Sequence, residues 1–219
     1  MIRAKRRARV FIVDDHPIVR KGIAELIRSA PDMEVCGDAA TLDEALRRIA
    51  ADRPDLVIVD LSLKGAGGLD LLKDLGIRHP EVKAVVVSMH DETLFAERAL
   101  RAGAKGYVMK HEAVDELQNA IRRVLDGKIY LSTSMSERLL SFVAGGRPAG
   151  ESSPLDRLSD RELEVFEMIG RGLGTREIAE KLHLSVKTIE SHREHIKDKL
   201  ALPSAAKLVQ HATQWVQSQ

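Results

Sequence analysis

The sequence predicts an α/β domain with a doubly wound parallel sheet, followed by a small all-α domain of four helices. Between residues 10 and 127, short apolar runs alternate with amphipathic helical patterns. These runs are almost continuously apolar, as expected for strands that are covered by helices on both faces. From residue 158 onward only the 3.6-residue period of helices remains.

Five strand-and-helix pairs are expected in the first region. The predicted strands are 10–14, 34–38, 55–60, 83–88 and 106–110, and the predicted helices are 17–29, 42–52, 67–78, 92–102 and 112–126. Local signals mark several helix ends. Pro17 suits a first helical turn, while Gly103 and Gly127 follow their helices as C-terminal caps. Thr41, with Glu44 three residues later, predicts a capping box.

The second region begins after a connector. The stretch GGRPAGESSPLD has the Gly, Pro and Ser content of a flexible linker. We therefore predict a first domain over 9–127, a connector over 128–157 with room for one further helix, and a second domain over 158–219. The helices expected in the second domain are 159–171, 175–182, 186–200 and 204–217.

Composition excludes several classes of protein. The chain has 219 residues, 44% of them apolar and 31% charged, which suits a globular protein. No apolar run has the length of about 20 residues that a membrane helix needs, so we expect a cytoplasmic protein. The single cysteine, Cys36, is interpreted as a small core residue. Residues 151–219 carry ten basic and eleven acidic side chains, so nucleic-acid binding must be argued from a motif rather than from charge.

Polar side chains follow four of the five predicted strands. Asp14 and Asp15 end the first strand, Asp60 the third, Ser88 the fourth and Lys110 the fifth. In an open parallel sheet, functional groups collect at this carboxyl edge. Three neighbouring carboxylates repel one another unless a cation intervenes, and oxygen ligands favour Mg²⁺. The sequence therefore predicts a magnesium site.

The same group of side chains is suited to phosphoryl transfer. Asp60 can attack a phosphoryl group and form an acyl phosphate, while Mg²⁺ and Lys110 neutralise the developing charge. Ser88 can donate a hydrogen bond to a phosphoryl oxygen. Taken singly, each residue has an ordinary alternative, because an aspartate after a strand is commonly a cap and a lysine there is commonly solvated.

Four motifs resemble the receiver domain of bacterial two-component response regulators, over residues 9–127: VDDHP, VDLSLKGAGGLDLL, VVVSMHD and GAKGYVMKH. The resemblance implies a flavodoxin-like fold and phosphorylation of Asp60 by a sensor histidine kinase. It also implies that Mg²⁺ is held by Asp14, Asp15, Asp60 and the backbone carbonyl of Ser62.

Three more residues match positions of the receiver family. Ser88 and Lys110 correspond to its phosphate-sensing hydroxyl and lysine, and Tyr107 to its aromatic switch residue. A half-buried aromatic at a strand edge is the ordinary alternative for Tyr107. These three roles are implied by the resemblance to the family and do not follow from the spacing of the residues.

Residues 172–200 predict a helix, a tight turn and a second helix. Thr175 and Ser185 are the expected N-caps of the two helices. The second helix could enter the major groove of DNA with its N-terminal half at base edges. A charged helix face can equally be a solvated one.

The wider segment from 158 to 219 resembles the LuxR-type helix-turn-helix, and its combination with a receiver is that of the NarL/FixJ class of response regulators. The resemblance implies DNA contacts at Lys187, Thr188, Glu190, Ser191, Arg193, Glu194 and Lys197. It implies scaffold roles for Glu162, Ile178, Ala179, Val186 and Ile189. Glu190 could accept from cytosine N4 and Ser191 could serve several bases, while Thr175, Arg193 and Lys197 suit phosphates. His192 is interpreted as a packed or backbone-bonded histidine.

The last predicted helix favours dimerisation. It carries more apolar side chains than three companion helices can cover: Ala205, Leu208, Val209, Ala212, Trp215 and Val216. We expect a homodimer through helix 204–217, through the receiver, or through both. Ordinary packing inside the domain is the alternative for this helix.

The function predicted from these features is a non-enzymatic transcriptional regulator that binds promoter DNA and is switched by phosphorylation. Two other functions remain open at this point. A Mg²⁺-dependent phosphohydrolase would use the same groups, but such enzymes usually carry an acidic residue where Ser62 stands. A phosphate-independent regulator would not need all five polar groups, although all five are present.

Overall fold

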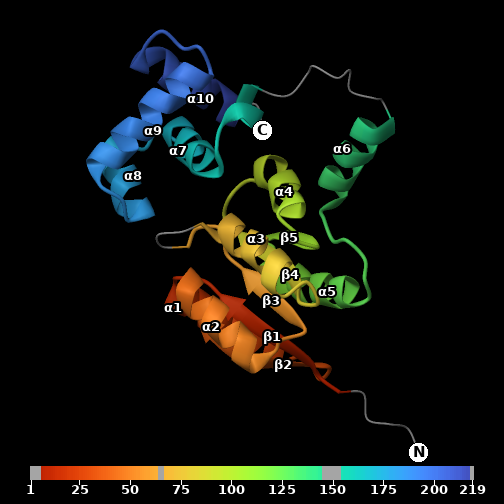
Figure 1. Cartoon of the computed structure of the whole chain (residues 1–219). Helices are drawn as coiled ribbons and strands as arrows, with labels where there is room; N and C mark the ends of the chain where they lie inside the picture. Colours follow the sequence, from red (N-terminus) through yellow and green to blue (C-terminus); the bar gives the residue numbers. More distant parts are fainter. Residues whose placement is uncertain (1–5, 64–66, 145–153, 218–219) are drawn as a thin grey trace, which may run out of the picture. The chain divides into compact units, whose positions relative to one another are not determined.

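The computed structural model describes residues 6–63, 67–144 and 154–217. The chain divides into two compact units, residues 1–141 and 142–219, and each is considered by itself (Figure 1). The division falls inside helix α6 (Thr133–Ala144), which lies in the stretch predicted as a connector with room for one helix.

The first unit is built on a five-stranded parallel sheet. Its strands are β1 (Ala8–Val13), β2 (Met33–Ala39), β3 (Leu56–Val59), β4 (Lys83–Ser88) and β5 (Gly106–Met109). The spatial order is β2-β1-β3-β4-β5, and all four pairings are parallel. Strand order reverses between β1 and β3, which makes their carboxyl ends the topological switch point of a doubly wound sheet. The predicted fold class is confirmed.

Helices cover both faces of this sheet (Figure 1). They are α1 (Pro17–Arg28), α2 (Leu42–Asp52), α3 (Gly68–Arg78), α4 (Glu92–Arg101) and α5 (Ala113–Leu125). Ile12 and Ile58 share a buried cluster with Ile27 of α1 and Ile121 of α5. Phe11 alternates with Ile12 along β1 and is equally buried, which explains why this strand is apolar at every position from Val10 to Val13.

Most of the predicted helix ends are confirmed, with one correction. Pro17 begins α1, and Gly103 and Gly127 follow α4 and α5 with φ values of +112° and +83°. The Thr41 hydroxyl accepts from the Glu44 amide at 3.3 Å, as a cap should. The Glu44 carboxylate, however, accepts from the amide of the preceding Ala40 at 3.0 Å, so the reciprocal half of the capping box reaches one residue further back.

Cys36 is not a core residue, contrary to the sequence interpretation. Val10 pairs with Val35 and Phe11 with Gly37, so Cys36 is the extra residue of a bulge in edge strand β2. Its side chain is only partly buried. That burial still raises the pKa of the Cys36 thiol, against the opposing charge of Arg9.

Among the described residues of the second unit, every regular element is a helix. Its elements are η1 (Pro154–Arg157), α7 (Asp160–Gly170), α8 (Thr175–Leu182), α9 (Val186–Lys199) and α10 (Ala205–Gln217). The 3₁₀ turn η1 was not predicted, and the four α-helices agree with the expected ranges to within one residue at each end. Phe166, Ile178, Ile189, Ile196 and Leu208 form the centre of this unit and are fully buried.

Candidate functional site

Strand pairing brings the three aspartates together. Val13 pairs with Val59, so Asp14 and Asp60 follow directly at the ends of adjacent strands, and the Asp60 amide donates to the Val13 carbonyl at 2.8 Å. Asp14 and Asp60 are each 1% exposed and Asp15 is 8% exposed. The predicted convergence of these carboxylates at the carboxyl edge is therefore present.

Lys110 joins the cluster from the end of β5. Its Nζ lies 2.7 Å from Asp14 Oδ2 and 2.7 Å from Asp60 Oδ2. Burial raises the pKa of the Asp60 carboxyl, against the opposing effect of Lys110 and with help from Asp14. Burial alone would lower the pKa of Lys110, but the charges of Asp60 and Asp14 outweigh it and raise that pKa.

The donor set fits a divalent cation. One ligand atom from each of Asp14, Asp15, His16 and Asp60 lies within 4.8 Å of the others. Asp14 Oδ2 and Asp15 Oδ1 are buried and make no hydrogen bond of good angle among the described residues. Lys110 Nζ lies 2.7 Å from Asp14 Oδ2, and the His16 ring nitrogen Nδ1 lies 2.6 Å from Asp15 Oδ1. One ammonium among three carboxylates leaves net negative charge that a hard, oxygen-bound ion such as Mg²⁺ would neutralise.

A histidine that sequence reasoning missed connects the remaining predicted residues. Ser88 is fully buried, and its Oγ accepts from the His90 amide at 3.1 Å. Tyr107 is 1% exposed rather than half-buried, and its hydroxyl donates to the His90 carbonyl at 2.8 Å. The His90 ring nitrogen Nε2 lies 2.9 Å from Ser62 Oγ. The sequence signal was the histidine two positions after Ser88 in VVVSMHD.

Ser62 lies beside the candidate phosphoacceptor. Its amide donates to Asp60 Oδ1 at 3.2 Å, which fixes the turn after β3. Metal ligation by its carbonyl stays a prediction. The backbone of Ser88 also meets Lys110, since the Lys110 amide donates to the Ser88 carbonyl at 2.8 Å.

Gly68 is a second residue that the sequence prediction missed. It begins α3, and its amide donates to the Leu61 carbonyl at 2.9 Å. A Cβ at this position would lie 2.1 Å from the Asp60 carbonyl oxygen. Only glycine therefore allows α3 to start this close to Asp60. The glycine-rich run GAGG was the available signal.

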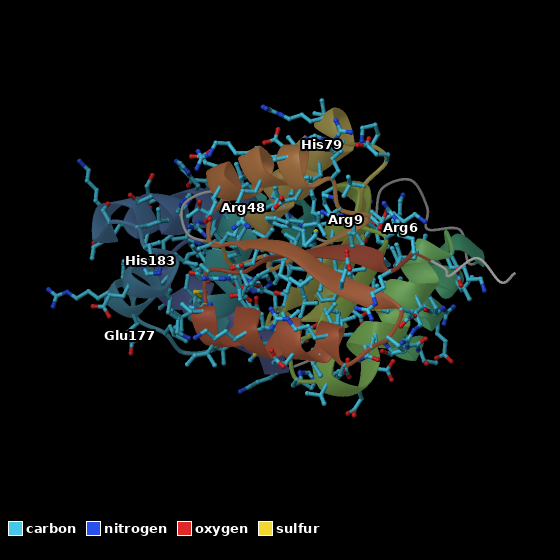
Figure 2. All side chains as sticks on the ribbon, turned by 90° about the horizontal axis from the view of Figure 1, so that it is seen from below. Arg6, Arg9, Arg48, His79, Glu177 and His183 are labelled. Atoms are coloured by element: carbon cyan, nitrogen blue, oxygen red, sulfur yellow. The ribbon has the colours of Figure 1, made fainter. Side chains whose placement is uncertain are left out.

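In the second unit, α8 and α9 form the expected helix-turn-helix. Ser185 caps α9, because its hydroxyl accepts from the Thr188 amide at 3.0 Å. Thr175 is not a cap, which corrects the prediction. Gly174 is the N-cap and Thr175 the first helical residue, because the Glu177 carboxylate accepts from the Gly174 amide at 2.7 Å. Figure 2 shows Glu177 and His183 on this helix pair.

The scaffold assignments hold with one exception. Ile178, Ala179 and Ile189 are buried, and Glu162 is 4% exposed at the N-terminus of α7. Val186 is 39% exposed, so it does not support the core, because the first residue of α9 lies on the solvent side of the turn.

The residues expected to face DNA differ in exposure. Lys187, Glu190, Ser191 and Glu194 are exposed, while Thr175, Thr188, Arg193 and Lys197 are partly buried. The Thr188 hydroxyl lies 2.7 Å from Ser185 Oγ, within the cap. Lys197 Nζ pairs with Glu194 at 2.7 Å and is only 18% exposed, which places it on the flank of the helix.

Helix α10 buries part of the apolar surface that was predicted for a dimer. Leu208 and Ala212 are fully buried, and the Trp215 ring lies 6.2 Å from that of Phe166 in α7. Val209 is 42% exposed and Ala205 is also exposed. The exposed apolar stripe is therefore narrower than the sequence suggested, because α7 covers the other side.

Two family matches define the class of the chain. Residues 10–122 match the response regulator receiver domain, and residues 156–212 match the luxR family of bacterial regulatory proteins. The chain belongs to the two-component response regulators that join a receiver to a LuxR-type helix-turn-helix. This membership favours a regulator over a phosphohydrolase.

Particular relatives extend over almost the whole chain. The oxygen regulatory protein NreC of Staphylococcus aureus (strain bovine RF122 / ET3-1) is 38% identical over 208 residues, which are 93% of this chain and 96% of NreC. RcsB from Salmonella enterica serovar Typhimurium, bound to promoter rprA in the presence of phosphomimetic BeF₃⁻, is 28% identical with a TM-score of 0.62, covering 94% of this chain and 98% of RcsB. A structure of two RcsB dimers bound to two parallel DNAs is 27% identical, with a TM-score of 0.58 over 94% of this chain and 98% of RcsB.

Within the part of the chain that the structure describes, every helix is too short or too polar to cross a membrane.

Proposed function

We propose that this protein receives a phosphoryl group on Asp60 from a sensor histidine kinase. It then binds promoter DNA as a homodimer, and α9 of each copy contacts the DNA. The observation that carries the proposal is the buried Asp60 carboxylate with Lys110 Nζ at 2.7 Å and Asp14 and Asp15 beside it. The receiver is proposed to span 9–127, the connector 128–157 and the DNA-binding domain 158–219.

The chemistry follows from these groups. An Asp60 oxygen attacks the phosphorus of the kinase's phosphohistidine, the P–N bond breaks, and an acyl phosphate forms. Lys110 neutralises charge on the transferring group. Mg²⁺, held by Asp14, Asp15, Asp60 and the Ser62 carbonyl, would supply further positive charge to the phosphoryl oxygens. Imidazole is a poor ligand for Mg²⁺, so His16 is not assigned to this ion.

Phosphorylation is coupled to the rest of the receiver through Ser88. Its hydroxyl oxygen now accepts from the His90 amide, and it would turn to donate to a phosphoryl oxygen. That exchange breaks the hydrogen bond between the Ser88 hydroxyl and the His90 amide. The carbonyl of the same residue accepts a hydrogen bond from the Tyr107 hydroxyl. The proposed result is a shift between two arrangements of this segment.

DNA recognition is proposed for α9. Lys187, Glu190, Ser191 and Glu194 are exposed on one side of α9. Thr188, Arg193 and Lys197 are partly buried on the same helix, and the partly buried Thr175 begins α8. Because residues 151–219 carry no excess of positive charge, one copy can neutralise few phosphates. Two copies would double that number, which favours a dimer. A protein that binds promoters must lie in the compartment that holds the DNA, so the proposed location is the cytoplasm.

The phosphoacceptor is tested with a small phosphodonor. Wild-type protein incubated with acetyl phosphate and Mg²⁺ should gain one phosphoryl group, measured by intact-mass spectrometry. Asp60→Asn should gain none, and EDTA should abolish the gain in wild type. The matched control is Asp70→Asn, an exposed aspartate in the first turn of α3, which should behave as wild type. Full incorporation into Asp60→Asn would refute the assignment.

The proposed dimer surface is tested on α10. Val209→Glu adds a charge to the exposed apolar stripe and should shift the phosphorylated protein to the monomer in sedimentation velocity. Gln210→Glu adds the same charge beside the stripe, where it can still meet Lys207, and should leave the dimer intact. If Val209→Glu remains a dimer, the α10 surface is not the interface, and the interface is assigned to the receiver instead.

A further inference from the structure

A second group of metal-binding side chains lies in the helical unit, at the contact of α7 and α9. Glu162 comes from the first turn of α7, and His192 and His195 come from α9. One ligand atom from each of the three lies within 4.8 Å of the other two. Residues three apart on a helix share a face, so both imidazoles are directed toward the same neighbour.

His192 is in a state suited to ligation. Its Nδ1 is buried and has no hydrogen-bond partner among the residues that the structure describes. Burial, together with the nearby charge of Arg161, lowers the pKa of His192. A ring nitrogen that carries no proton has the free lone pair that a metal requires.

The Glu162 carboxylate divides its two oxygens between different partners. Oε2 accepts from the Ser159 amide at 2.7 Å and from Lys199 Nζ at 2.6 Å. Oε1 lies 3.8 Å from Nδ1 of His195, whose side chain is 59% exposed. Hydrogen bonds to the far oxygen of a carboxylate orient it for ligation, as outer partners do in many metal sites.

We propose that Glu162, His192 and His195 form a binding site for Zn²⁺. Two imidazole nitrogens and one carboxylate oxygen are a common donor set for this ion, with the fourth position left to water. Ligand atoms of a tetrahedral zinc site lie about 3.3 Å apart, which follows from bonds of about 2.0–2.1 Å. The 3.8 Å between Glu162 Oε1 and His195 Nδ1 needs only a small rotation of the exposed imidazole.

The ordinary role of Glu162 as a capping residue accounts for its burial and for the use of Oε2. It does not account for an unpartnered His192 nitrogen beside a second histidine at the same carboxylate. Bound Zn²⁺ would link α7 to α9 and stabilise the helix proposed to read DNA. It would also add two positive charges to residues 151–219, which have one more acidic than basic side chain.

The test uses the full chain with excess Mg²⁺, so that the acidic cluster of the first unit is occupied. Zn²⁺ is titrated against a competing chelator, and Co²⁺ replaces it for absorption spectra. We expect His195→Gln to weaken Zn²⁺ binding about tenfold or more and to abolish the strong visible band of four-coordinate Co²⁺. Zn²⁺ should also shift the imidazole NMR signals of His192 and His195 and raise the melting temperature of wild type alone.

Two matched variants locate the ion. His183→Gln removes an exposed histidine between α8 and α9 (Figure 2), and His16→Gln removes the histidine of the acidic cluster. Both should bind Zn²⁺ as wild type does. Equal affinity in His195→Gln, or a loss of binding in His16→Gln, would overturn the site. His195 is exposed, and an unchanged melting temperature of His195→Gln without Zn²⁺ will show that it folds.

Discussion

Replacing Gly68 by alanine should separate phosphorylation from folding. A Cβ at this position would lie 2.1 Å from the Asp60 carbonyl oxygen, 2.7 Å from the Leu61 Cα and 2.9 Å from the Asp60 carbonyl carbon. All three are backbone atoms of the segment that carries the candidate phosphoacceptor. They cannot rotate aside as a side chain could, so either this segment or the start of α3 must move.

The size of the effect follows from that overlap. Non-bonded heavy atoms prefer separations of about 3.5 Å, so a contact at 2.1 Å requires a displacement of more than about 1 Å. A misplacement of about 1 Å can lower a reaction rate about 100-fold. We therefore expect Gly68→Ala to accept phosphate from acetyl phosphate about 100-fold more slowly. Overpacking should cost about 1–3 kcal/mol of unfolding free energy, which leaves a typical domain folded.

The assay is the rate of phosphoryl incorporation followed by intact-mass spectrometry, with urea unfolding on the same samples. Gly76→Ala is the matched control, because Gly76 lies in the same helix and a Cβ there meets nothing within 4 Å. It should keep the wild-type rate and gain about 0.5–1 kcal/mol of stability. A folded Gly68→Ala protein that is phosphorylated at the wild-type rate would refute the reasoning.

Two further perturbations test other parts of the chain. Gly170→Ala places a Cβ 2.5 Å from the Ala212 carbonyl oxygen, so it should lower the unfolding free energy of the second unit by about 1–3 kcal/mol. Urea unfolding followed by the fluorescence of Trp215 measures this change. An unchanged unfolding midpoint would contradict the close packing of α7 and α10. Burial raises the pKa of Cys36 and thus favours its protonated thiol, so alkylation by iodoacetamide should rise with pH around a midpoint above the ordinary value of about 8.5. Urea should return that midpoint to the ordinary value, and identical midpoints with and without urea would contradict the shift.

Much of the first unit could be predicted because its signals are periodic. Continuous apolar runs specify strands covered on both faces, and parallel strands necessarily present their carboxyl ends at one edge. The convergence of Asp14, Asp60 and Lys110 follows from that rule alone. The Ser62–His90 contact and the close approach of Gly68 depend on loop conformations that no period encodes.

The errors in the second unit have a local cause. Threonine is a favourable N-cap residue, which made Thr175 the natural choice at the start of α8. The N-cap is instead the preceding residue, Gly174, whose amide donates to the Glu177 carboxylate, and Thr175 is the first residue of the helix. Cap preference therefore locates a helix end to within a residue, and the competing side chain decides between neighbours.

The position of His90 indicates how a local chemical event at Asp60 could reach Tyr107. Ser88 Oγ, the Tyr107 hydroxyl and Ser62 Oγ all contact this one residue, through its amide, its carbonyl and its ring. The Ser62 amide in turn donates to the Asp60 carboxylate. The segment after β3 therefore contacts His90, which lies in the segment after β4. A phosphoryl group on Asp60 would compete with the His90 amide for the Ser88 hydroxyl, and it would at the same time disturb the turn at Ser62. Tyr107 would then respond without touching the phosphate, because the backbone that holds its hydroxyl is the part that moves.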